Sequence, residues 1–154
     1  MTTATPPSRR RVARSKIVAV VSDIHFDLHH RASWEAFVQW HQFVKPFKTV
    51  VLGDFLDLGM MSRYLPEAGQ SRDPIAQIEC FVGEMKRLVP TTQELVVVEG
   101  NHDERWSRYL LGAAPDIFAR AKGLSLKDQC DAHGLPPCVW IRENTELTGY
   151  AIGP

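Results

Sequence analysis

Three short clusters of acids, histidines and an amide each follow an apolar stretch of the chain. They are Ser22-Asp23-Ile24-His25, Gly53-Asp54-Phe55-Leu56-Asp57 and Gly100-Asn101-His102-Asp103. Carboxylate oxygens, imidazole nitrogens and an amide oxygen, with no thiolate among them, suit Mn²⁺, iron or a catalytic Zn²⁺ better than a structural zinc. Two such ions about 3.5–4 Å apart can polarise a phosphoryl group and generate hydroxide near neutral pH. If the clusters meet, the chemistry they predict is phosphoester hydrolysis.

The first two clusters offer the acidic ligands. Asp23 and His25 are two residues apart, so they would point to the same side and chelate one ion if strand geometry continued through them. Asp54 directly follows a glycine that permits a tight turn, and its two oxygens could bridge two ions. Several carboxylates in one crevice repel one another unless some are protonated or cations neutralise them, which again favours bound metal.

The third cluster offers a candidate acid. His102 follows Asn101 immediately, so its side chain should diverge from the metal and face the substrate. Asp103 could pair with the imidazole and keep it protonated as the general acid for the leaving alkoxide. Arg105 could hold a phosphate oxygen. A surface arginine in a first helical turn is an equally good interpretation of Arg105.

The elements that must position these clusters indicate an α/β fold. Strands are expected at residues 16–22, 48–53 and 94–99, each apolar throughout, as in parallel strands covered on both faces. Such strands, separated by helices, predict βαβ crossovers whose carboxyl ends share one crevice. The expected helices are 34–44 with Ser33 as N-cap, 75–89 with Asp73 as N-cap and Pro74 at its first position, 100–111 and 115–122. Residues 123–154 should be rich in loops, with short strands at 138–142 and near Tyr150.

In this order and strand context, the clusters resemble the first three motifs of the calcineurin-like metallophosphoesterases, over about residues 16–108. The resemblance implies a metallophosphoesterase-type sandwich of β-sheets flanked by helices, with a dinuclear centre of two divalent metal ions (Mn, Fe or Zn). The ligands it implies are Asp23 and His25 on one ion, Asn101 on the other and Asp54 bridging both. It also implies that His102 acts on the leaving group with Asp103 behind it, while Asp57 supports the ligands through hydrogen bonds.

The chain departs from the family pattern after the third motif. The family completes its centre with a histidine after a later strand and a Gly-His-x-His segment. The last histidine here is His133, which follows a polar stretch and which we interpret as a loop residue. We therefore expect residues 16–154 to be the N-terminal part of a longer phosphoesterase domain, incomplete at its C-terminus and weakly active or inactive alone. A degenerate, non-catalytic scaffold for protein binding is the alternative.

Two positions favour the phosphodiesterase or nuclease-like branch. Ser/Thr protein phosphatases of the family carry an arginine after the second motif and a glutamate at the end of the third. This chain has Leu58 and Asp103 at these positions. A phosphoester substrate is expected, with nucleotides and nucleic acids among the candidates, and the sequence indicates no particular protein partner.

Composition limits the remaining possibilities. The chain has 154 residues and balances 18 Lys+Arg against 18 Asp+Glu, but its first 16 residues hold five basic and no acidic residues. Residues 1–15 should form a flexible basic tail that is solvated rather than bound to nucleic acid, because the body is acidic. The longest apolar run, 17–21, is far below the roughly 20 residues of a membrane span. Three cysteines without CxxC spacing fit a reducing cytoplasm.

Overall fold

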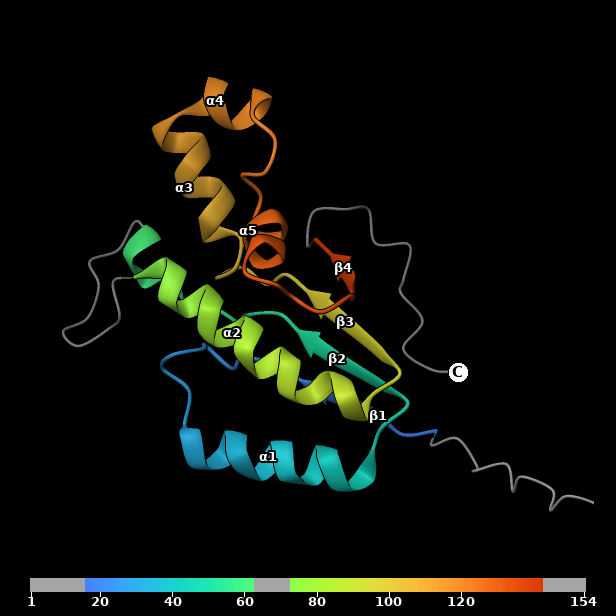
Figure 1. Cartoon of the computed structure of the whole chain (residues 1–154). Helices are drawn as coiled ribbons and strands as arrows, with labels where there is room; N and C mark the ends of the chain where they lie inside the picture. The colour runs from blue at the N-terminus through green and yellow to red at the C-terminus, as the bar shows by residue number, and fades with distance from the viewer. Residues whose placement is uncertain (1–15, 63–72, 143–154) are drawn as a thin grey trace, which may run out of the picture.

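The computed structural model describes residues 16–62 and 73–142 of the chain. Within them one parallel sheet has the strand order β1 (Val18–Val21), β2 (Lys48–Leu52), β3 (Glu94–Val98) and β4 (Val139–Ile141) (Figure 1). The α/β class and all four strands expected in this part of the chain are confirmed, with ends that differ by two residues at most. The described residues form this one sheet, so the second sheet of the expected sandwich is not among them.

The register of the sheet brings the carboxyl ends of three strands to one edge. Val20 pairs with Val50 and Val50 pairs with Val96, all in parallel ladders. Since β1, β2 and β3 end at Val21, Leu52 and Val98, the polar residues that follow each strand begin at the same level.

Two long helices cover the sheet on the side of the main core. The helices α1 (Arg31–Val44) and α2 (Pro74–Leu88) connect β1 to β2 and β2 to β3, and they run side by side (Figure 1). Apolar residues of both helices and of the sheet form one buried cluster, which includes Val38, Val51, Phe81 and Val97. Burial of this stripe, rather than helix propensity, supplies most of the stability of such helices.

The helix starts confirm one expectation and correct another. Asp73 caps α2 by accepting hydrogen bonds from the backbone N–H groups of Ile75 and Ala76. The expected cap of α1, Ser33, is wrong, because α1 begins at Arg31 and His30 is its N-cap. His30 has an extended backbone, and its Nδ1 accepts the N–H of Ser33 at 3.3 Å, which is the role a serine or aspartate cap usually plays.

A buried polar network joins α1 to the sheet. His41 of α1 is fully buried, with Nε2 2.7 Å from Thr49 Oγ1 and Nδ1 2.9 Å from Thr91 Oγ1. Thr49 lies on β2 and Thr91 on the short 3₁₀ helix η2 (Val89–Thr91). Both ring nitrogens are therefore satisfied away from water, as buried polar groups must be.

Between β3 and β4 lie α3 (Arg105–Ala113), α4 (Pro115–Arg120) and α5 (Leu126–Ala132). The second matches the helix expected at 115–122 to within two residues, whereas the first begins five residues later than the expected start at residue 100, because residues 101–104 form a turn. The third corrects the expectation of loops, because Ser125 and Asp128 form a capping box and Leu126 and Cys130, one turn apart, are buried against the core. His133 is the C-cap of α5, outside any strand, and its carbonyl accepts a hydrogen bond from Lys86.

Other expectations fall outside the described residues. The basic tail at 1–15 and the short strand near Tyr150 lie there. None of the helices in the described ranges is both long and apolar enough to cross a bilayer.

Candidate metal centre

The loops that follow β1, β2 and β3 are joined to one another by backbone hydrogen bonds. The N–H of Asp23 donates to the carbonyl of Gly53 at 3.2 Å, and the N–H of His25 donates to the carbonyl of Asp54 at 3.1 Å. The N–H of Gly53 in turn donates to the carbonyl of Val98 at 3.0 Å. These bonds extend the parallel pairing one step beyond the strands and hold the three polar clusters together.

Asp23, His25 and Asp54 form a first group of possible metal ligands. One ligand atom from each lies within 4.8 Å of the others. Strand geometry does not continue through Asp23 and His25, because β1 ends at Val21 and both residues are left-handed, with φ of 52° and 50°; their ligand atoms nevertheless lie close together. Aspartate and histidine tolerate this region better than most residues, and strained backbone of this kind is concentrated at functional sites.

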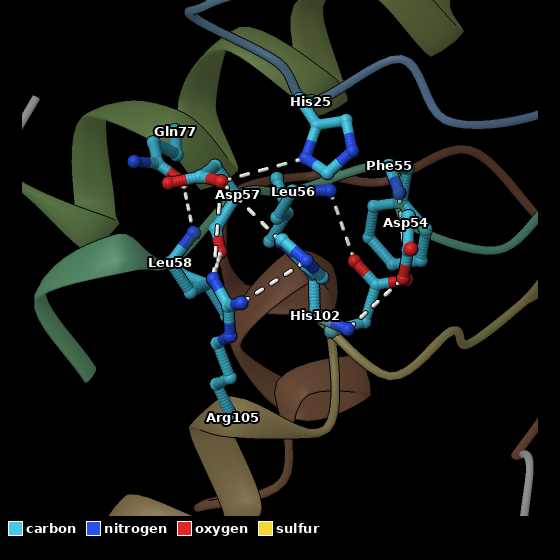
Figure 2. Close-up of polar contacts among 10 residues, drawn as sticks. His25, Asp54, Phe55, Leu56, Asp57, Leu58, Gln77, His102 and Arg105 are labelled. Carbon is cyan, nitrogen blue, oxygen red and sulfur yellow. Dashed lines mark hydrogen bonds and ion pairs between the residues drawn. The ribbon is translucent and has the colours of Figure 1, made fainter. Parts of the chain in front are cut away.

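Two glycines make room for Asp54. Gly53 has φ of 76°, and a Cβ there would lie 3.2 Å from the Cα of Gly100. A Cβ on Gly100 would collide with the backbone nitrogen and the carboxylate of Asp54. Asp54 Oδ1 also accepts the N–H of His102 at 2.9 Å (Figure 2). The close approach of the second and third clusters therefore depends on these glycines.

Asn101 lies at the same edge of the sheet. It lines a hollow of about 270 Å³ together with Asp23 and Asp54. Three of the expected ligands thus line one space, and Asn101 is exposed.

His25, Asp57 and His102 form a second group of possible ligands. Asp57 Oδ1 lies 3.5 Å from His25 Nδ1 and 3.3 Å from His102 Nδ1, and the two imidazoles meet edge to face at 4.6 Å (Figure 2). Asp57 is only 7% exposed. His25 thus belongs to both groups, which makes the two groups continuous.

The donor set fits a divalent cation. His25 Nδ1 and Asp57 Oδ2 are buried and have no hydrogen-bond partner among the described residues. Orphaned buried polar atoms are rare unless an ion or water satisfies them. Neutral imidazoles and carboxylates are also the ligand types that Mn²⁺, Fe²⁺ and Zn²⁺ accept.

Asp103 does not lie where the sequence placed it. Its carboxylate accepts backbone N–H groups from Gly100 at 2.8 Å, Leu56 at 2.9 Å and Phe55 at 3.4 Å, so it ties the third cluster to the second instead of pairing with His102. Asp103 is 1% exposed, and this burial raises its pKa to about 8, although the three amides act to lower it. The carboxylate beside the imidazole of His102 is that of Asp57.

Arg105 contacts the other side of His102. Its guanidinium donates to the backbone carbonyl of Asp57 at 2.7 Å and lies 3.0 Å from His102 Nε2 (Figure 2). A guanidinium has only donors, so His102 Nε2 accepts in this arrangement and the ring proton sits on Nδ1, toward Asp57. This geometry places a cation directly at the edge of the candidate centre.

Gln77 is a contributor that the sequence analysis missed. It is 1% exposed on α2, and its Oε1 accepts the N–H of Leu58 at 2.9 Å (Figure 2). Leu58 is left-handed, with φ of 48°, so this bond holds the chain where it turns away from Asp57. The sequence did offer a signal for this role, because Gln77 places an amide one turn before Phe81 on the apolar face of α2.

Comparison with known proteins identifies a family. The model of the family described as calcineurin-like phosphoesterase matches residues 17–147. The matched segment contains all three polar clusters, the strands before them and β4. Searches of curated proteins and of solved structures give no match.

Proposed function

The chain belongs to the calcineurin-like phosphoesterase family, and on that premise we propose that it hydrolyses phosphodiesters at a dinuclear metal centre with His102 as general acid. Membership indicates metal-dependent phosphoester hydrolysis. The observation that carries the finer proposal is the ligand group of Asp23, His25 and Asp54, with His102 and Asp57 directly beside His25, at the carboxyl ends of three parallel strands. Ligand sites of open α/β sheets lie at this end of the strands.

Four residues would hold the metal. Asp23, His25 and Asp54 would bind one divalent ion, and Asp54 would share a second with Asn101. The shared space of Asp23, Asp54 and Asn101 supports this division. When bound, such ions supply Lewis acidity and an activated water near neutral pH.

His102 would deliver a proton to the leaving oxygen from Nε2. Its Nδ1 faces Asp57, whose carboxylate would orient the ring and stabilise its protonated form. Arg105 donates to Nε2 in the present arrangement, so a protonated His102 would release it. The freed guanidinium would then bind a phosphate oxygen, a role that suits its planar set of donors.

The preference for diesters rests on Leu58. This residue is fully buried and packs in the main core, so its position supplies no cation to the site. The arginine that Ser/Thr protein phosphatases of the family carry at this position, a cation for the dianionic phosphate of a monoester, is therefore absent. A site without that charge suits a singly charged diester better.

Metal binding and hydrolysis test the proposal together. The purified chain is dialysed against Mn²⁺, its metal content is measured, and hydrolysis of bis(p-nitrophenyl) phosphate is compared with that of p-nitrophenyl phosphate. We expect bound Mn²⁺, weak hydrolysis that is faster for the diester than for the monoester, and loss of that hydrolysis without loss of metal in His102→Ala. His133→Ala, a histidine at the end of α5, is the matched control. A chain that binds no Mn²⁺, or whose metal content is unchanged by Asp54→Asn, would favour the non-catalytic scaffold.

A further inference from the structure

We propose that the cavity between α3 and η1 (Gly59–Met61) receives the leaving group, and that this group is a nucleotide carrying a second phosphate. The proposal rests on the function assigned to His102 above and names the substrate class of the same site. It is argued from the size of the cavity, the helix face that lines it, the charges along it and its position next to His102.

The cavity is large and opens beside the candidate metal centre. Its volume is about 720 Å³, and its lining includes Asn101, Met61 and Ser62. Small-molecule sites commonly have about 300–1,000 Å³. The space is thus sufficient for a nucleotide and larger than a bare phosphate or a methyl ester needs.

One face of α3 forms a wall of the cavity. Arg105, Arg108, Tyr109 and Gly112 follow one another at helical spacings of three, one and three residues, so they share a face, and all of them line the cavity. Trp106 points away from this face and is 7% exposed, with its Nε1 donating to the carbonyl of Leu124 at 2.8 Å. The buried Trp106 therefore fixes α3 from the side opposite to the cavity.

The charges along the wall favour an anion. Arg105 and Arg108 both line the cavity, and none of the described residues that line it is an acid. Arg108 pairs with Glu104, yet its side chain is 60% exposed, and a guanidinium with five N–H donors can bind a phosphate in addition to one carboxylate. The edge of the sheet that carries the acids lies next to this wall. A substrate phosphate beyond the scissile one would therefore lie against the two arginines.

The same wall offers a surface for a flat ring. Tyr109 is 48% exposed, and Met61 also lines the cavity. Aromatic rings and thioethers both pack favourably against the face of a base. A ring and a second phosphate together are the chemistry of a nucleotide.

His102 contacts one of the residues that line this space. Arg105, which lines the cavity, is 3.0 Å from His102 Nε2, the atom proposed to protonate the leaving oxygen. A group that departs from His102 therefore enters the cavity. This places the nucleotide on the leaving side of the scissile bond.

Direct binding tests the cavity without requiring catalysis. The probe is thymidine 3′,5′-bisphosphate, titrated calorimetrically into the full chain in EDTA, with thymidine as the comparison ligand. Gly112→Trp should fill the cavity, because a Cβ at Gly112 meets no atom within 4 Å. Gly83→Trp is its matched control, since Gly83 is an exposed helical glycine on α2 with equally open surroundings.

We expect the bisphosphate to bind about tenfold or more tightly than thymidine, since charge-assisted hydrogen bonds add to its affinity. Gly112→Trp should weaken it by about tenfold, as should Tyr109→Ala, which removes the stacking surface. Arg108→Gln should bring the two ligands closer in affinity, and Gly83→Trp should bind as the wild type does. Unchanged binding in folded Gly112→Trp and Tyr109→Ala, or equal affinity for the two ligands in the wild type, would overturn the inference. Absence of hydrolysis with Mn²⁺ would instead contradict the proposed function and leave these affinities as they are.

Discussion

Asp57 Oδ1 lies 3.3 Å from His102 Nδ1, although 45 residues separate the two in the sequence. Asp103, which directly follows His102, directs its carboxylate to three backbone amides instead. The two carboxylates therefore have different tasks. Asp57 faces His102, the candidate general acid, and Asp103 joins the loops that carry the site. Each task leads to a separate experiment.

Asp57→Asn should lower kcat for bis(p-nitrophenyl) phosphate by about 10–100-fold, the range typical of groups that orient a reacting residue. The reason is that the amide cannot stabilise the protonated imidazole as the carboxylate does. If Asp57 acts through His102, adding Asp57→Asn to His102→Ala should cause little further loss. Asp131→Asn, at an exposed position on α5, serves as the control. Additive losses in the double variant would show that Asp57 acts on something else, such as metal binding through His25.

Asp103→Ala should destabilise the fold by about 3 kcal/mol, because it leaves the N–H groups of Gly100, Leu56 and Phe55 without their acceptor in a buried place. Urea unfolding monitored by tryptophan fluorescence measures the change. Asp57→Ala, which removes no backbone acceptor among the described contacts of that carboxylate, should cost clearly less. Equal losses in the two variants would contradict the division of tasks.

Gly100→Ala should abolish metal binding. The new methyl group would occupy the space of the Asp54 carboxylate and backbone nitrogen, so the second and third clusters would have to separate. Gly83→Ala, in an exposed and unstrained helical position, should instead stabilise the chain by about 0.5–1 kcal/mol. Metal content after dialysis and urea unfolding test both variants. Full metal content in Gly100→Ala would mean that the observed contact between the clusters is dispensable.

His41 should make stability depend on pH. Burial lowers its folded-state pKa from the ordinary 6.5, so protonation costs the folded chain more than the unfolded one. The contribution of His41 is therefore fully present above about pH 6.5 and is lost as the pH falls below that value. Unfolding free energies of wild type and His41→Gln, measured between pH 5 and pH 8, should converge toward acidic pH. Parallel curves would show that the ring titrates alike in both states.

Much of the fold could be predicted from the sequence, because the strands and helix starts depend on residues that are close together in the chain. The apolar runs before Asp23, Asp54 and Gly100 predict parallel strands, and parallel strands in neighbouring positions bring their carboxyl ends to one edge. Asp73 and Pro74 likewise mark the start of α2 by chemistry confined to one helical turn. Helix α5 was missed since only Leu126 and Cys130 carry its apolar face, too few to show a period.

The sequence alone determined which ligand types meet at the sheet edge, because order along parallel strands dictates which residues arrive there. Only the tertiary structure decided which carboxylate faces His102 and where the cavity beside α3 opens. The left-handed turns at Asp54 and Leu58 rotate Asp57 toward the imidazole, while the amides of Phe55 and Leu56 attract Asp103. Spacing does not encode such choices, because each depends on backbone directions set by contacts between segments far apart in the chain.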